Sequence, residues 1–284
     1  MNRCVASGKG GTGKTTLAVS LAQVAPDSAY VDCDVEAPNG HLFLRPSITQ
    51  KSEVTRVVVA VDLDKCTWCG KCMDACAYHA IVIAHATKRA LVFEDLCTGC
   101  GVCGFVCPDN AIREEERPAG VVTEGYSDGI ATRAGCMNVD APHAHPTLKA
   151  TLEDLPDRPL VVIDAEPGVT GRVVDTVRRS DVCLLVTEPT PFGRHDLELA
   201  LMMTRHLGVP SALVINRSDI GDESVRDFCR AEKVPVLLEI PFDRRIAAGY
   251  ADGRTLLEVR PDLRGAIGNV LERLRALARG KGER

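Results

Sequence analysis

The 284-residue sequence has few aromatic side chains and no long apolar run. Aromatic residues make up 4% of the chain, and no apolar segment approaches the roughly 20 residues that a membrane-spanning helix needs. An excess of basic residues is also missing, because the formal net charge is -5 at pH 7, which argues against nucleic-acid binding. The first residues lead into an apolar stretch without a secretory signal, so we expect a cytoplasmic protein that does not enter a membrane.

Cysteine, by contrast, is abundant, with 13 residues. Thiols are kept reduced in the cytoplasm, so metal binding explains this number better than disulfides do. Eight of the cysteines form two C-x-x-C-x-x-C-x-x-x-C runs, which begin at Cys66 and Cys97 and are offset by 31 positions. Asp64 and Asp95 match under the same offset. The cysteine runs therefore belong to an internal repeat.

The double run has the spacing of bacterial two-cluster ferredoxins. In that pattern three neighbouring thiolates bind three irons of a [4Fe–4S] cube, and the fourth thiolate comes from the other repeat. The first predicted cluster is held by Cys66, Cys69, Cys72 and Cys107, and the second by Cys97, Cys100, Cys103 and Cys76. Tetrahedral zinc, which also uses C-x-x-C pairs, is the alternative. Ala77 replaces the proline that follows a ferredoxin run, a change that removes no ligand.

A glycine-rich loop near the start of the chain predicts a second kind of site. It fits G-x-x-x-x-G-K-[ST], with an apolar strand before it and an apolar helix after it. Its backbone amides and the helix N-terminus are expected to hold phosphates, Lys14 to contact the β/γ-phosphates, and Thr15 to bind Mg²⁺. The predicted ATP-binding residues of this loop are Gly8, Lys9, Gly10, Gly11, Thr12, Gly13, Lys14, Thr15 and Thr16.

The early lysine of the loop, Lys9, makes the sequence K-G-G-T-G-K-T. This resembles the deviant loop of the MinD/ParA/Mrp ATPases, a family that includes the nitrogenase iron protein. The resemblance implies an ATP-dependent dimer, of two identical chains or of this chain with a paralogue, in which Lys9 reaches the other subunit's nucleotide. A solvated loop lysine is the alternative. By the same resemblance, Asp34 in D-x-D activates the attacking water and Asp32 lies near Mg²⁺, unless Asp32 only caps a turn.

A second apolar strand ends at Asp164 and continues as D-x-x-P-G, which resembles the second switch of the same family. Asp164 is expected to hold Mg²⁺ and Gly168 to offer its amide to the γ-phosphate. Asn216 and Pro241 are predicted to contact the base. Because Asn216 to Asp219 also resembles the guanine signature N-K-x-D, GTP stays an alternative to ATP. The predicted catalytic residues are Lys9, Lys14, Asp34 and Asp164.

These patterns predict an α/β fold with a mostly parallel P-loop sheet, helices on both faces, and an inserted small α+β domain of bacterial ferredoxin type. The expected boundaries are 1–58 and 117–284 for the ATPase and 59–116 for the insert. A short antiparallel meander is expected from Val121 to Val139. The closing helix, with Ile267 and Leu274 on its apolar face, is expected to pack on the sheet. Cys136, His143 and His145 could form a further metal site, but their spacing fits no established ligand pattern, so exposed loop histidines are expected.

Together these features predict a dimeric switch that hydrolyses ATP and couples its turnover to electron transfer to a partner protein. The predicted cofactors are ATP, Mg²⁺ and two [4Fe–4S] clusters. Because the insert leaves the chain after the first switch and returns before the second, the switches can gate the clusters. Two alternatives stay open: an ATP-driven factor that assembles or delivers an iron–sulfur or other metal cofactor, and a redox-sensing ParA/MinD-like positioning ATPase.

Overall fold

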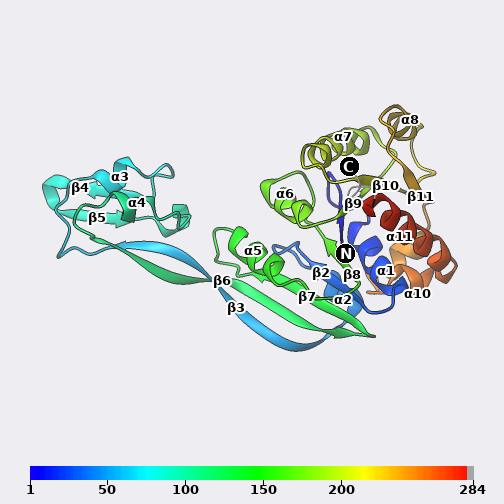
Figure 1. Cartoon of the computed structure of the whole chain (residues 1–284), viewed down its shortest axis with the longest axis horizontal. Helices are drawn as coiled ribbons and strands as arrows, with labels where there is room; N and C mark the ends of the chain where they lie inside the picture. Colours follow the sequence, from blue (N-terminus) through cyan, green and yellow to red (C-terminus); the bar gives the residue numbers. More distant parts are fainter. Residues whose placement is uncertain (280–284) are drawn as a thin grey trace. The chain divides into compact units, whose positions relative to one another are not determined.

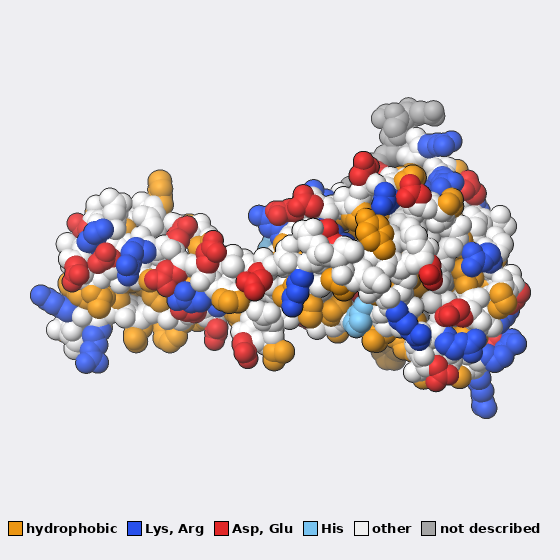
Figure 2. All heavy atoms as spheres, turned by 90° about the horizontal axis from the view of Figure 1, so that it is seen from below, with side chains coloured by type: hydrophobic (Ala, Val, Ile, Leu, Met, Phe, Trp, Pro, Cys, Tyr) orange, Lys and Arg blue, Asp and Glu red, His pale blue; other side chains and the backbone are white. Residues whose placement is uncertain are grey.

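The structure is a computed structural model that describes residues 1–279 (Figure 1). The chain forms two compact units. The first comprises Met1–Ser52, Val122–Cys136 and the chain from Leu148 onward, and the second comprises Glu53–Val121 and Met137–Thr147. Figure 2 shows charged side chains of both signs intermingled on one face. None of the helices in residues 1–279 has the length and apolar character to cross a membrane.

A nine-stranded sheet organises the first unit, in the order β11-β10-β9-β1-β8-β2-β7-β6-β3. The strands from β11 to β7 all pair in parallel. Three of them, β2, β8 and β9, are buried along their whole length, as strands with helices on both faces must be. Their bounds are β1 Asn2–Ala6, β2 Ser28–Asp32, β7 Ile130–Met137, β8 Leu160–Asp164, β9 Val182–Thr187, β10 Ser211–Asn216 and β11 Val236–Ile240.

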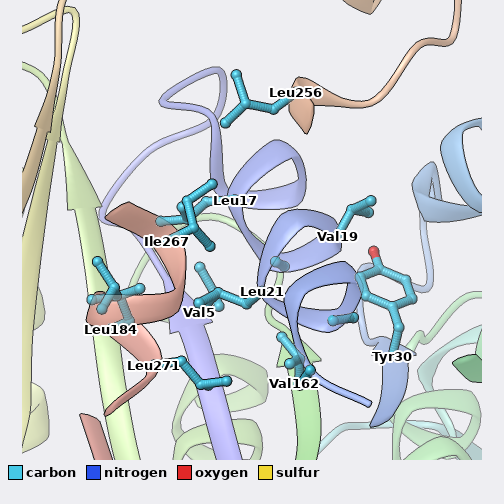
Figure 3. Packing of buried hydrophobic residues seen from close by; sticks show 14 of the residues in the cluster. Val5, Leu17, Val19, Leu21, Tyr30, Val162, Leu184, Leu256, Ile267 and Leu271 are labelled. Atoms are coloured by element: carbon cyan, nitrogen blue, oxygen red, sulfur yellow. The ribbon is translucent and has the colours of Figure 1, made fainter. Parts of the chain in front are cut away.

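Helices cover both faces of this sheet, as predicted. On one face, α1, α2, α10 and α11 pack on Val5, Val162 and Leu184 (Figure 3). On the other, α6, α7 and α8 pack on the alternate strand residues Cys4 and Leu185. The helices are α1 Lys14–Val24, α2 Gly40–Leu44, α5 His145–Glu153, α6 Gly171–Arg178, α7 Pro191–His206, α8 Ser224–Ala231, α9 Arg244–Ala251, α10 Leu256–Val259 and α11 Arg264–Arg279, with a 3-10 turn at Pro261–Leu263.

The closing helix α11 packs on the sheet, which confirms the prediction from its apolar face. Ile267, Val270 and Leu274 are fully buried, and Leu271 joins them in the core below α1. These positions recur every three or four residues, so they share one face of the helix. The apolar stripe of α11 is therefore part of the core.

The predicted meander from Val121 to Val139 is present as consecutive strands joined by a tight turn, but not as a small element separate from the main sheet. The region contains two long strands of the main sheet, β6 (Ile112–Ser127) and β7, joined through Asp128 and Gly129. Gly125 and Gly135 interrupt the apolar pattern of this region, yet both lie inside strands, so the strands are longer than that pattern predicts. A Cβ on Gly125 would lie 2.3 Å from the carbonyl oxygen of Ser47 in β3 (Ser47–Val61). Gly125 therefore marks a close approach of two strands rather than the end of one.

The second unit is built from two copies of one small motif, related by the offset of the cysteine runs. The helices α3 (Lys71–Asp74) and α4 (Val102–Val106) are equivalent and lie against each other. The strands β4 (Ile81–Ala84) and β5 (Arg89–Val92) pair antiparallel, and 3-10 turns cover His85–Thr87 and Glu94–Leu96.

Equivalent hydrogen bonds join the two copies. The amide of Asp62 donates to the carbonyl of Ala111 at 2.7 Å, and the amide of Phe93 donates to the carbonyl of Ala80 at 2.8 Å. Both donors and both acceptors are related by the same sequence offset. The repeat in the sequence is therefore also a repeat in the structure.

Candidate functional site

A cavity of about 390 Å³ lies at the carboxyl ends of the central strands of the first unit. Open parallel sheets bind their ligands at this edge. One end of the cavity is formed by the phosphate-type loop, with Asp34, Asn39 and Pro167 beside it. The other end is mainly apolar and is formed by Val186, Val214, Ile240, Pro241, Phe242, Ile246, Ala247, Tyr250 and Leu256. The shape thus offers a polar end for phosphates and an apolar end for a ring.

Most of the predicted loop residues line this cavity, namely Gly10, Gly11, Gly13, Lys14, Thr15 and Thr16. Helix α1 begins at Lys14 and has no side-chain cap, so its first amides are available to an anion. Gly13 has a φ of 95°, and a Cβ there would lie 2.6 Å from the side-chain nitrogen of Asn216. Glycine is therefore required at this position for both conformation and space.

Three predicted loop residues do not line the cavity. Gly8 packs against α7, where a Cβ would lie 2.4 Å from Cβ of Asp196. Thr12 is buried, and its hydroxyl lacks a hydrogen-bond partner. Lys9 points to Glu188, with 3.8 Å between Nζ and Oε2.

Glu188 is a residue that the sequence analysis missed. Its side chain is only 8% exposed and also accepts a hydrogen bond from Nη1 of Arg217 at 2.7 Å. Lys9 and Arg217 are far apart in sequence, so neither periodicity nor a loop motif pairs them with Glu188. The buried carboxylate compensates two cations in this arrangement. The reach of Lys9 to a second subunit stays a prediction, and it requires Lys9 to leave Glu188.

The two buried carboxylates Asp32 and Asp164 face each other from neighbouring strands, at matching positions of β2 and β8. The hydroxyl of Tyr30 donates to Oδ2 of Asp164 at 3.0 Å. Asp32 accepts three backbone amides of the following turn, those of Asp34, Asn39 and Gly40. Asp32 therefore caps the turn, which was the alternative to a place near Mg²⁺. It does so from a position beside Asp164.

Burial and, next, the charge of Asp164 together raise the pKa of Asp32 to about 7, against the opposing hydrogen bonds from the backbone amides of Gly40 and Asp34. Burial also raises the pKa of Asp164, while Lys14 and the Thr15 hydroxyl lower it. Oδ1 of Asp164 is buried and has no hydrogen-bond partner. A divalent cation beside Thr15 would compensate both charges and bind this oxygen. The donor set therefore fits Mg²⁺.

Asp34 lines the cavity on the side of the loop lysine. Burial raises its pKa, and the charge of Lys14 opposes this shift. Asp34 is only partly buried, and its backbone amide is bonded to Asp32 at 3.2 Å. The carboxylate is thus held next to the phosphate end of the cavity, where it can orient a water molecule.

The second predicted switch lies beside the loop. The amide of Gly168 donates to the carbonyl of Ser7 at 2.9 Å, so its predicted contact with a γ-phosphate requires this bond to be exchanged. Arg172 connects the two switch segments: it lies 2.7 Å from Glu166 and 2.7 Å from Glu36. The sequence analysis missed this ion-pair network, because its members lie in segments that meet only in the folded chain.

At the apolar end, Asn216 lines the cavity but is already engaged. Its side-chain nitrogen donates to the carbonyl of Thr12 at 2.9 Å, and its oxygen accepts the amide of Arg217 at 3.0 Å. Asp219 accepts the amide of Phe242 at 2.6 Å and is not among the cavity residues. The ring-binding wall from α9, which includes Tyr250, was not predicted, because it belongs to no motif.

The eight cysteines of the two runs gather in two sets of four in the second unit. One small hollow is lined by Cys66, Cys69, Cys72 and Cys107, and another by Cys76, Cys97, Cys100 and Cys103. Each set takes three cysteines from one repeat and one from the other. Backbone amides donate to the sulfurs of the two exchanged residues, Cys76 at 3.3 Å and Cys107 at 3.2 Å. None of the described cysteines forms a disulfide.

Within residues 1–279, no three His, Cys, Asp or Glu side chains converge on a point where one metal ion would bind. A single zinc ion needs four sulfurs about 2.3 Å from one centre, whereas a cube spreads its thiolates over four irons. This absence supports neither the zinc alternative nor the two clusters, and the group that the cysteines hold stays a prediction. His145 is exposed, as expected, but it opens α5, and His143 is half-buried with Nε2 unpartnered, contrary to the expectation of exposed loop histidines.

Comparisons with known proteins agree with this fold. The chain is 28% identical to Uncharacterized protein MJ0579 of Methanocaldococcus jannaschii, covering 94% of both chains, and 26% identical to MJ0578 of the same organism, covering 97% of this chain and 96% of the other. It is similar in structure to MinD of Pyrococcus horikoshii complexed with Mg-ADP, with a TM-score of 0.58, 20% identity and 99% coverage of both chains.

Two further solved structures are similar at comparable levels. One is the cell division ATPase MinD of Pyrococcus furiosus, with a TM-score of 0.56, 20% identity, and coverage of 97% of this chain and 98% of the other. The other is a ParA family ATPase from Chlorobium tepidum, with a TM-score of 0.54, 13% identity, and coverage of 95% and 98%. At these identities they show the fold. The CobQ/CobB/MinD/ParA nucleotide binding domain matches residues 4–256, and the chain therefore belongs to that family.

Proposed function

We propose that this protein is a dimeric ATPase whose turnover is coupled to electron transfer from two [4Fe–4S] clusters to a partner protein. The observation that supports this best is the combination, in one chain, of a P-loop cavity and two sets of four cysteines. Family membership supports nucleotide binding. The thirteen cysteines without a disulfide among the described residues suit a reducing, cytoplasmic compartment.

ATP is the proposed nucleotide. The phosphates would lie on the loop and the N-terminus of α1, with Lys14 beside them and Mg²⁺ held by Thr15 and Asp164. Asp219 is the residue that would read guanine in an N-K-x-D signature, and it is engaged by the backbone of Phe242 outside the cavity. This favours adenine. In the proposed mechanism Asp34 orients the attacking water, and Lys9 of one subunit contacts the nucleotide of the other.

The cysteine sets fit the proposed clusters by their donor chemistry. Each set offers four thiols, three from one repeat and one from the other, as a pair of cubes requires. Amide-to-sulfur hydrogen bonds to Cys76 and Cys107 stabilise thiolate charge. When bound, each cluster supplies a one-electron redox step. This chain's residues bind the clusters, limit their access to water, and connect them to the nucleotide site.

The covalent path supports the proposed coupling. The chain leaves the first unit within β3, after the turn that holds Asp32, and returns within β6. It crosses into the second unit once more at Met137–Thr147 before β8 ends at Asp164. The segments that connect the units therefore lie between the two switches in sequence. ATP would order the switches and favour the dimer, and hydrolysis would release both. A movement of the switches would then act on the cysteine-containing unit through these connecting segments.

A redox-sensing positioning ATPase is the second candidate. The specific observation in its favour is the likeness to structures described as a cell division ATPase and a ParA family ATPase. In that case the clusters would regulate the ATPase instead of donating electrons to a partner. A chain that hydrolyses ATP equally well with either redox state of the clusters would argue against this candidate.

The nucleotide site is tested by a pair of variants. Lys14→Ala removes the charge beside the β/γ-phosphates, so we expect loss of ATP binding in calorimetry. Asp34→Ala leaves that charge in place, so we expect ATP binding with hydrolysis reduced by roughly 100-fold or more, as for a lost general base. Sedimentation with ATP should then show an accumulated dimer. Equal loss of binding in both variants would contradict the assignment of Asp34 to the hydrolysis step.

The cysteine sites are tested by metal content. Anaerobic purification should give about eight irons and eight sulfides per chain, because each cube contains four of each. Cys69→Ala and Cys100→Ala, at equivalent positions of the two repeats, should each reduce the iron content to about four. The substitution Cys229→Ala, outside the runs, is the control and should leave it unchanged. One zinc and little iron per chain would refute the cluster proposal.

A further inference from the structure

The two cysteine sites differ in the side chains around them, although the repeat makes them equivalent in backbone. The first site is the set of Cys66, Cys69, Cys72 and Cys107, and the second site is the set of Cys76, Cys97, Cys100 and Cys103. Six apolar or aromatic residues besides the cysteines line the hollow of the second site, and three of them, Tyr78, Leu96 and Val102, are also exposed. We call these three residues the apolar collar. Among the described residues, no Asp, Glu, Lys or Arg lines that hollow.

The equivalent positions of the first site are all charged. Tyr78 corresponds to Asp109, Leu96 to Lys65, and Val102 to Lys71, under the offset that superposes the cysteine runs. Asp109 lines the first hollow and accepts the hydroxyl of Thr67 at 2.6 Å. Thr67 also has an equivalent, Thr98, in the second site. The internal repeat therefore provides a comparison in which the cysteines stay constant and the surrounding polarity changes.

The apolar collar lies at the surface. Its members Tyr78, Leu96 and Val102 are 55%, 48% and 43% exposed, and the neighbouring Phe105 is 92% exposed. Apolar side chains reach the surface of this unit at several places (Figure 2). Phe105 corresponds to Asp74 of the first repeat, so the same replacement of charge by an apolar side chain extends beyond the hollow itself. At these equivalent positions the second site therefore has apolar side chains, and the first site has charged ones.

We infer that the two sites have different reduction potentials, with the second site more reducing than the first. Reduction adds a negative charge to a group already bound by four thiolates. An apolar collar excludes the water that would stabilise this charge, and so it lowers the potential. At the first site Lys65 and Lys71 are next in sequence to Cys66 and Cys72 but outside the lining of the hollow, and Lys65 lies 3.8 Å from Asp62. Asp109 lines the hollow and opposes these two cations. All three charged groups are exposed and screened by water, so the inference depends on the exclusion of water by the apolar collar.

Hydrogen bonds to sulfur do not explain the inferred difference in reduction potential between the two sites. The amide of Ala80 donates to Cys76 at 3.3 Å, and that of Ala111 donates to Cys107 at 3.2 Å, so this contribution is matched between the sites. Water access and charge are the remaining influences on the potential. The inference rests on the proposed function, because it requires clusters in both sites. It deepens that proposal, because it makes the cluster of the second site the stronger electron donor and the cluster of the first site the one that is reduced first.

Two single-site chains test this inference directly. Cys69→Ala keeps only the second site complete, and Cys100→Ala keeps only the first. Anaerobic redox titrations followed by electron paramagnetic resonance should place the cluster of the Cys69→Ala chain at the more negative potential. Equal potentials, or the reverse order, would overturn the inference. A wild-type chain that binds no iron would overturn the proposed function as well, whereas a chain with eight irons and no ATP coupling would leave the inference standing.

A second variant tests the role assigned to the apolar collar. Val102→Lys in the Cys69→Ala chain places the first site's charge at the equivalent position of the second. We expect a less negative potential with unchanged iron content. Val82→Lys is the matched control, because Val82 is 38% exposed on β4 but lines neither hollow, and it should leave the potential unchanged. No shift with Val102→Lys, or the same shift with both variants, would show that the collar does not set the potential.

Discussion

Tyr30, which belongs to no motif, donates a hydrogen bond to a carboxylate of the proposed cation site. The ring of Tyr30 packs in the core with Val19 and Val162 (Figure 3). Its hydroxyl donates to Asp164. Asp164 has another carboxylate oxygen that is buried without a partner, so the group already lacks part of its hydrogen bonding. Loss of the tyrosine hydroxyl would leave the carboxylate still less compensated in a buried setting.

We therefore predict that Tyr30→Phe lowers the free energy of unfolding by about 1–3 kcal/mol, the cost of leaving a buried acceptor unsatisfied. Urea denaturation of the nucleotide-free protein measures this change. The control is Tyr126→Phe, which removes a hydroxyl from a residue that is 51% exposed and should change stability by less than about 0.5 kcal/mol. If both variants match the wild type, the hydroxyl of Tyr30 contributes nothing to the stability of this site.

At the scale of helices and strands, the elements that were predicted correctly are those with a local burial pattern in the sequence. The runs 160–163 and 182–186 are apolar throughout, and they lie in the buried parallel strands β8 and β9. The apolar stripe of α11 likewise identified its packing face. These elements were predictable because burial on both faces of a strand gives a continuous apolar run, and burial of one helix face gives a periodic apolar stripe.

The elements that were missed or wrong depend on contacts between distant segments. Gly125 looks like the end of a strand until the proximity of Ser47 is known. The contact of Glu188 with Lys9 and the wall that Tyr250 adds to the cavity join segments that share no motif. The spacing of the cysteines is different, because a repeat encodes a long-range relation in the sequence itself. For that reason the pairing of the two repeats was predictable and the ion-pair networks were not.

At the scale of the whole molecule, the proposal requires a signal to pass from the nucleotide to the cysteine sites. Lys9 is the residue on which this signal depends. It now lies 3.8 Å from Glu188, and in an ATP-bound dimer it would exchange that partner for the other subunit's phosphates. A charge-assisted contact of this kind contributes about 1.5–3 kcal/mol, so its loss should weaken ATP-dependent dimerisation about tenfold or more.

The Lys9→Ala protein should therefore bind ATP as a monomer and dimerise poorly. The Asp34→Ala protein should form the ATP-bound dimer and remain dimeric. If the clusters respond to closure, their potentials should differ between the ADP state and a non-hydrolysable ATP state of the wild type. That difference should disappear in Lys9→Ala and persist in Asp34→Ala. Anaerobic redox titration of the three proteins in each nucleotide state measures it. Identical potentials in all states would mean that the clusters and the nucleotide are not coupled within this protein, and the cysteine-containing unit would then be an attached sensor.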